Sequence, residues 1–131
     1  MSIDTIGDFL TIIRNGVLAS KREVVAPYSN LKYEIAQILK AEGFVREALV
    51  LTGEDNHKQI KLSLKYVDGE SAIHEIKRIS TPGRRNYKGV SSVSPVIGNL
   101  GITILTTNRG VITNKKARQL SVGGEVLCTI W

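Results

Sequence analysis

The side chains best suited to catalysis in this chain stand alone rather than in sets. Cys128, the only cysteine, lies in the apolar run Val126–Trp131, where a buried structural thiol is expected rather than an activated nucleophile. His57 and His74 have no second histidine or cysteine at the spacing of metal ligands, and no phosphate-binding glycine loop is present. The sequence therefore predicts no catalytic residue, no metal site and no cofactor.

A second group of residues is suited to binding nucleic acid. Arg84, Arg85 and Lys88 surround Tyr87 in one short segment. The cations suit phosphate groups, and the ring can stack on an unpaired base or a ribose. The alternative interpretation is a basic loop in which Tyr87 anchors the two parts of the chain to each other.

Small polar groups gather at a predicted turn, Thr106–Gly110, which offers two hydroxyls, an amide, a guanidinium and a glycine backbone. Groups of this kind can read 2′-hydroxyls and base edges in the shallow minor groove of RNA, although an ordinary polar turn has the same composition. The basic segment that follows, Lys115–Gln119, predicts a short helix capped by Asn114. On this helix Lys115 is suited to contact a phosphate.

Positive charge is concentrated in the C-terminal part of the chain. The formal net charge of the 131 residues is +6, and the seven basic and one acidic side chains of residues 81–131 account for all of it. A one-sided field of this kind attracts polyanions, although a merely solubilising surface is the alternative. We place the boundary between two predicted lobes, 1–80 and 81–131, at Thr81-Pro82-Gly83, where the charge changes.

The composition predicts a cytoplasmic protein. A single cysteine allows no intrachain disulfide, which agrees with a reducing compartment. No run approaches the ~18 apolar residues of a membrane span. The N-terminal sequence does not resemble a secretory signal either, so we expect no membrane contact.

The elements that would position these residues form an α+β fold. In the first lobe, helical spacing predicts a helix capped by Thr5 with Asp8, and a second helix that starts at Ser29 or Asn30 and ends at Gly43. Alternation predicts three strands, Val24–Ala26, Phe44–Leu51 and Gln59–Val67. The first lobe is thus predicted to be an α/β lobe with two helices on a small sheet.

The segment 71–80 fits two structures. Ile73, Ile76 and Ile79 recur every third residue, which favours a short helix, whereas the preceding turn at Asp68-Gly69 favours an antiparallel strand. The second lobe is predicted to be mostly β with a short helix. Its expected strands are Ile102–Thr106, Val111–Thr113 and Val126–Trp131.

The stretch Gly101–Arg118 resembles the signature of the bacterial small-subunit ribosomal protein S-eight family. That signature consists of Gly, two residues, two aliphatics, Ser or Thr, Thr, two residues, Gly, two aliphatics, four residues, a small residue and usually a basic one. Every constrained position is met here. Further blocks that resemble the family are Asp4–Gly16, Leu39–Phe44, Leu64–Tyr66, Ser80–Lys88 and Gly123–Glu125.

The resemblance implies a function in the small ribosomal subunit. Family members bind the central domain of 16S-type ribosomal RNA directly, help organise it, and lie as monomers among neighbouring small-subunit proteins. Some also bind messenger RNA of their own operon, which makes that RNA a further candidate partner. The implied fold, an α/β lobe followed by a mostly β lobe, agrees with the pattern above.

The resemblance also implies which residues contact RNA. The hairpin Thr106–Gly110 would make the main contacts, Tyr87 and the loop Gly123–Glu125 would complete that surface, and Arg14 and Lys32 would contribute weaker contacts. With the cations named above, the predicted RNA-binding residues are Thr106, Thr107, Asn108, Gly110, Tyr87, Arg84, Arg85, Lys88, Gly123, Gly124, Glu125, Lys115, Arg118, Arg14 and Lys32.

Some positions depart from the family pattern. Thr106 and Asn108 stand where many bacterial members have serine. The family often has a proline at the position of Thr5 and an arginine at that of Ile13. Two other functions compete with the implied one. A free-standing RNA or DNA regulator would also be basic and globular, and a small enzyme would have to use Cys128 or a histidine.

Overall fold

The computed structural model describes residues 4–89 and 101–131. Within them the chain divides into two compact units, Asp8–Ile73 and a second unit made of residues 4–7, 74–89 and 101–131. The predicted lobe boundary follows residue 80, whereas the unit changes between Ile73 and His74. None of the helices in the described ranges is long and apolar enough to cross a membrane.

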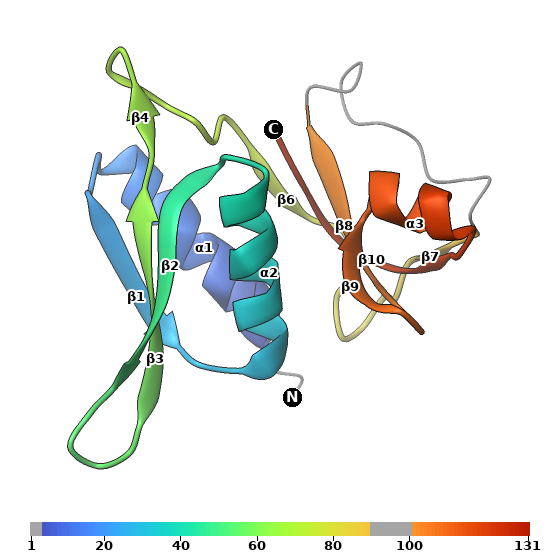
Figure 1. The fold of residues 1–131 in the computed structure, drawn as a ribbon, viewed down its shortest axis with the longest axis horizontal. Coiled ribbons are helices and arrows are strands. Elements are labelled where there is room, and N and C mark those ends of the chain that lie inside the picture. Colours follow the sequence, from blue (N-terminus) through green and yellow to red (C-terminus); the bar gives the residue numbers. More distant parts are fainter. Residues whose placement is uncertain (1–3, 90–100) are drawn as a thin grey trace. The chain divides into compact units, whose positions relative to one another are not determined.

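The Asp8–Ile73 unit is built on a three-stranded antiparallel sheet. Its strand order is β1-β3-β2, with β1 at Glu23–Pro27, β2 at Val45–Thr52 and β3 at Lys58–Leu64. Two helices, α1 (Thr5–Leu18) and α2 (Asn30–Ala41), lie on one side of this sheet (Figure 1). The core is formed by the inward-facing side chains, of which the largest fully buried ones are Phe9, Leu10, Ile13, Ile35, Leu39, Ile60 and Leu62.

The ends of the two helices follow from local hydrogen bonds. Ser29 caps α2 by accepting a hydrogen bond from the Lys32 amide, and Gly43, with φ +81°, ends it as predicted. The predicted cap of the first helix is wrong. Asp4, not Thr5, accepts the hydrogen bond of a first-turn amide, that of Gly7, at 2.9 Å.

Asp4 is favoured at this end because its carboxylate also receives two hydrogen bonds from Arg78, each 3.2 Å long. Burial alone would raise the pKa of Asp4, but the hydrogen bonds from Arg78 and the Gly7 amide outweigh it and hold the pKa below its usual value. The preference for Asp4 thus depends on a residue far along the chain.

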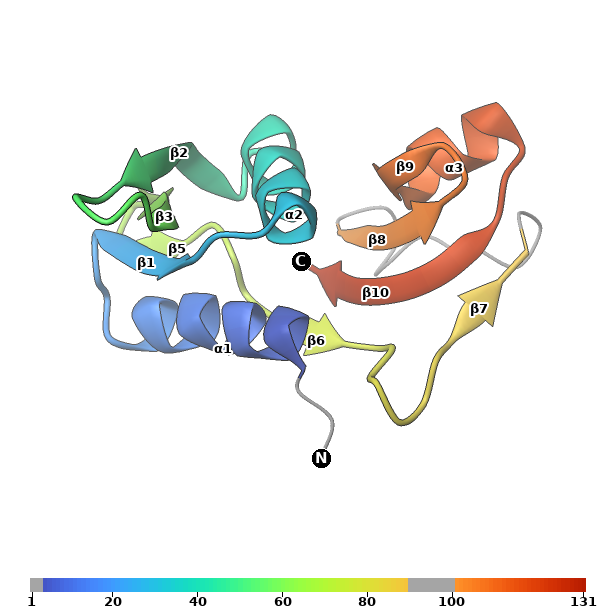
Figure 2. The ribbon, with the colours of Figure 1, turned by 90° about the horizontal axis from the view of Figure 1, so that it is seen from below.

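The second unit contains a sheet of strand order β6-β10-β8-β9, with β7 also paired to β10. Figure 2 shows β10 running beside β8, and α3 lying against β8 and β9. The elements are β6 (Ile76–Arg78), β7 (Tyr87–Lys88), β8 (Ile102–Thr107), β9 (Gly110–Thr113), α3 (Asn114–Leu120) and β10 (Gly124–Ile130). Leu105, Ala117 and Val126 form a buried cluster between α3 and the sheet. The α+β class, with an α/β part and a mostly β part, is confirmed.

The ambiguous segment 71–80 is extended rather than helical. β4 (Tyr66–Val67) and β5 (Glu70–Ser71) form a small hairpin, and β6 pairs antiparallel with β10. The spacing of the isoleucines would suit a helix, but residues 76–78 pair as a strand with Cys128–Ile130 instead.

Candidate nucleic-acid interface

Three predicted site residues lie side by side on adjacent strands. Glu125 of β10 pairs with Tyr87 of β7 on one side and with Thr106 of β8 on the other. Directly paired residues of antiparallel strands project to the same face of the sheet. Tyr87, Glu125 and Thr106 therefore form one continuous row, the cross-strand row, in which Tyr87 is 68% exposed.

The row leads to the tip of the β8–β9 hairpin. Thr107 pairs with Gly110, which leaves Asn108 and Arg109 as the two turn residues. The Thr107 hydroxyl donates a hydrogen bond to the Gly110 carbonyl oxygen and accepts one from the Arg109 amide, both 3.0 Å long. Thr107 thus holds the turn in shape, whereas Asn108 is exposed and presents its amide to solvent.

The two glycines before Glu125 allow these strands to approach. A Cβ atom on Gly124 would lie 2.2 Å from the Thr106 carbonyl oxygen, and one on Gly123 would lie 2.3 Å from the Lys88 carbonyl oxygen. Both contacts are with backbone, which cannot move aside as a flexible side chain can. The glycine pair therefore brings the hairpin tip, β7 and the start of β10 together.

The charge around this surface is mostly uncompensated. Arg85 donates a 2.9 Å hydrogen bond to the Glu125 carboxylate, which raises the pKa of Arg85. Arg84, Lys88 and Arg109 form no ion pair with any other residue that the structure describes. The sequence-based set of site residues omitted Arg109, although its place in the middle of the turn was a signal for including it.

The structure separates α3 from the cross-strand row. Leu105 and Val126, the neighbours in sequence of Thr106 and Glu125, point to the opposite face and pack against Ala117 of α3. Lys115 and Arg118 are exposed on the outer side of that helix. These two cations therefore lie on the opposite face of the sheet from the cross-strand row.

The predicted cap of α3 is also wrong. Thr113 caps the helix by accepting a hydrogen bond from the Lys116 amide. Asn114 is buried, and its side-chain oxygen accepts a hydrogen bond from the Thr103 amide at 3.2 Å. It bonds to β8 because that amide would otherwise be buried without a partner.

Comparison with known proteins agrees with the resemblance. The family described as Ribosomal protein S8 matches residues 4–131. A small ribosomal subunit protein uS8 of Ruegeria sp. (strain TM1040) is 44% identical over 128 residues, which cover 98% of both chains. The protein of the same name from Paracidovorax citrulli is 46% identical over 127 residues, 97% of this chain and 96% of its own. The chain belongs to the ribosomal protein S8 family.

Membership of the ribosomal protein S8 family makes the chain a ribosomal protein and not an enzyme. Cys128 and His74 occupy structural positions, and His57 lies exposed in the loop before β3. Burial raises the pKa of the Cys128 thiol to about 12, so that it stays protonated near neutral pH, and the His74 ring stacks on Trp131 with centroids 5.5 Å apart. Among the described residues, no three His, Cys, Asp or Glu side chains cluster as ligands of a metal ion.

The weaker contacts implied by the S8 resemblance lie in the Asp8–Ile73 unit. Arg14 is exposed near the end of α1, but Lys32 is only 6% exposed. Burial lowers the pKa of Lys32, and the Asp8 carboxylate acts in the opposite direction. Ile13 is fully buried in the core, so this position offers no RNA contact here. Of these positions only Arg14 is on the surface.

Proposed function

We propose that this chain is a structural component of the small ribosomal subunit that binds 16S-type ribosomal RNA and helps organise its central domain. Support comes from the family and from relatives named as small ribosomal subunit proteins that match nearly the whole chain. The chain then acts as a monomer in the cytoplasm, among neighbouring ribosomal proteins. Messenger RNA of its own operon is a second candidate ligand for the same surface.

The observation that carries the RNA contact is the convergence of the cross-strand row and the hairpin tip. Pairing brings Tyr87, Glu125 and Thr106 together from three segments of the chain, and Asn108 and Arg109 lie at the end of the same hairpin. An exposed ring and short polar groups suit the ribose and base edges of RNA. The glycines at 123 and 124 hold the strands of this surface close together.

The charge of the two units supports the same surface. The unit that holds residues 4–7 and 74–131 carries a formal net charge of +6, whereas Asp8–Ile73 is neutral. The long-range attraction for RNA is therefore expected to come from the unit that contains the cross-strand row. The proposed RNA-binding lobe remains the C-terminal part, 81–131.

The experiment that tests the proposed function is sedimentation. Tagged chain expressed in a bacterium should migrate with small subunits in a sucrose gradient, and not with free protein at the top. A free-standing RNA regulator would remain near the top of the gradient even when it binds the isolated RNA in solution. Such a result would contradict the ribosomal function while leaving RNA binding intact.

We expect Asn108→Ala to weaken binding to the specific RNA by about 1–3 kcal/mol, because an RNA group that meets the amide in a desolvated interface would lose its partner. Lys115→Ala is the matched comparison. A phosphate contact carries no sequence information, so this change should weaken specific and unrelated RNA nearly equally. Filter binding of both variants to both RNAs measures the difference. Equal losses on the two RNAs for Asn108→Ala would reduce the tip to a loop positioned by charge.

A further inference from the structure

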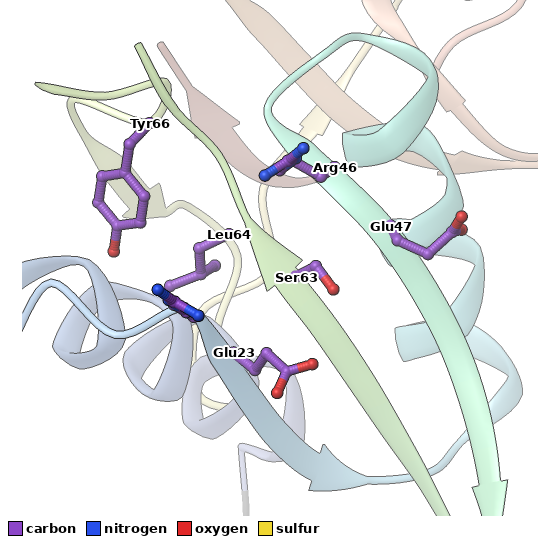
Figure 3. Close-up of a pocket in the computed structure, with 7 residues that line it drawn as sticks. Glu23, Arg46, Glu47, Ser63, Leu64 and Tyr66 are labelled. Carbon is purple, nitrogen blue, oxygen red and sulfur yellow. The ribbon is translucent and has the colours of Figure 1, made fainter. Parts of the chain in front are cut away.

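The Asp8–Ile73 unit contains a hollow that has no part in the proposed function. It is open to solvent and has a volume of about 730 Å³ at one end of the β1-β3-β2 sheet. Figure 3 shows residues of all three strands, together with Tyr66 of β4, arranged around it. Ligand pockets in proteins are typically about 300–1,000 Å³, so this hollow has the size of a site for a small organic group.

Two arginines reach the hollow from opposite sides of the central strand. The register of β2 against β3 shifts between Val45 and Glu47, so Arg46 is an extra residue with no partner of its own. A bulge of this kind redirects a side chain, and Arg46 lines the hollow together with Glu47. Arg22 precedes β1, and its carbonyl oxygen accepts a 2.8 Å hydrogen bond from the Leu64 amide.

The spacing of the two arginines suits a single anionic group. Their backbones flank β3, and adjacent strands lie about 4.8 Å apart. Two long side chains that start about 10 Å apart can therefore close on one phosphate from both sides. Arginine is suited to this contact because its planar group offers two parallel donors to phosphate oxygens.

The acidic side chains at the hollow do not form ion pairs with these two arginines. The two carboxylates at the hollow already have partners: Glu23 pairs with Lys61, and Glu47 with Lys40, each at 2.7 Å. The hydrogen bond from Lys40 holds the pKa of Glu47 below its usual value. The side chains of Arg22 and Arg46 form neither an ion pair nor a hydrogen bond with any other described residue.

The other walls of the hollow suit a ribonucleotide. Ser63 supplies a hydroxyl, and Tyr66 supplies an aromatic ring. The Tyr66 hydroxyl donates a 2.6 Å hydrogen bond to the Lys21 carbonyl oxygen, which holds the ring in place. A fixed ring beside two cations is the combination with which proteins bind unpaired nucleotides. An acidic peptide would use the arginines but would need neither the ring nor a hollow of this volume.

We propose that this hollow binds an unpaired nucleotide of ribosomal RNA, with its phosphate between Arg22 and Arg46 and its ribose or base against Tyr66. The inference rests on the proposed function, since the RNA is the partner named there. It adds an RNA contact to the electrically neutral unit, beyond the weaker one predicted for Arg14. The chain would then bind two separate segments of RNA.

In the experiment, the full ¹⁵N-labelled chain is titrated with a short single-stranded oligouridylate. NMR measures the shifts of its backbone amide resonances. Signals of Arg46, Ser63 and Leu64 report on the hollow, and those of Asn108 and Gly110 report on the hairpin tip. We expect a saturable shift of the hollow signals, and we expect inorganic phosphate at constant ionic strength to compete with it. Polyglutamate should leave the hollow signals unmoved.

The test variant is the double substitution Arg22→Gln and Arg46→Gln, and the matched control is Lys21→Gln. All three side chains are exposed cations, but Lys21 does not line the hollow. We expect the affinity reported by the hollow signals to fall about tenfold in the double variant, roughly the loss of one hydrogen bond to a charged group. The log–log salt slope should also become less steep by about 0.7. The control should change neither.

The other possible outcomes would contradict the nucleotide site in the hollow. Tip signals that shift while the hollow signals stay still would overturn the hollow and leave the proposed function standing. Signals that stay still at both places would also overturn the hollow, whereas the sedimentation experiment decides the proposed function separately. An equal loss of affinity in Lys21→Gln would overturn the nucleotide site in favour of general electrostatic attraction. A larger shift of the hollow signals with polyglutamate than with RNA would overturn it in favour of a protein contact.

Discussion

Replacing Gly124 by alanine is expected to destabilise the second unit by about 3 kcal/mol, the upper part of the range for overpacked sites. The added Cβ would lie 2.2 Å from the Thr106 carbonyl oxygen and 2.8 Å from Cγ2 of Thr107. The side-chain carbon can rotate away, but the carbonyl oxygen is fixed by the pairing of β8 with β10. Relief of the clash therefore requires those strands to separate at the hairpin tip.

Thermal unfolding of Gly124→Ala, followed by circular dichroism, measures this effect. Gly83→Ala is the control, because a Cβ at that position meets nothing within 4 Å. We also expect Gly124→Ala to lose affinity for RNA in its folded fraction, since Tyr87 and Thr106 would no longer share one row. A melting temperature equal to that of Gly83→Ala would show that the strands approach less closely than the structure indicates.

Replacing Tyr87 by leucine is expected to weaken RNA binding by about 1–3 kcal/mol and to leave stability nearly unchanged. The affinity effect is the usual loss when a ring that stacks on a base is truncated. The stability expectation follows from exposure. Because the side chain is 68% exposed, its replacement removes little buried surface. This exposure argues against the alternative in which Tyr87 is a buried anchor.

Tyr87→Phe is the matched variant, because it keeps the face of the ring and removes only the hydroxyl. Stacking predicts that phenylalanine binds RNA nearly as well as tyrosine, whereas leucine does not. Thermal unfolding and RNA titration of both variants separate the possibilities. A lowered melting temperature for Tyr87→Leu with unaltered affinity of the folded protein would assign Tyr87 to the fold rather than to the RNA.

Much of the identity of this protein could be read from local pattern. The signature Gly101–Arg118 pointed to the family that the comparisons then showed. Alternation and helical spacing placed the helices and most strands, because these patterns have periods that the backbone itself imposes. Gly43 ends α2 with a positive φ, a conformation that favours glycine in any fold.

The errors arose where the partner of a residue lies far along the chain. The choice between helix and strand for 71–80 stayed open for the same reason, because it depends on the pairing of residues 76–78 with β10. Asp4 caps α1 in place of Thr5, and its carboxylate also binds Arg78, 74 residues away. Local propensity contains no information about such partners, and hydrogen bonds to them outweigh its small preferences.

The arrangement of the candidate sites was decided by tertiary structure alone. The sequence by itself determined which residues are basic, aromatic or small, and hence predicted an RNA-binding surface. Only pairing across β7, β10 and β8 aligned Tyr87, Glu125 and Thr106, and only packing buried Lys32. The hollow likewise depends on the bulge at Arg46, which no periodicity reveals. Sequence spacing determines the face on which a side chain projects, but the neighbour it meets there depends on how distant strands align.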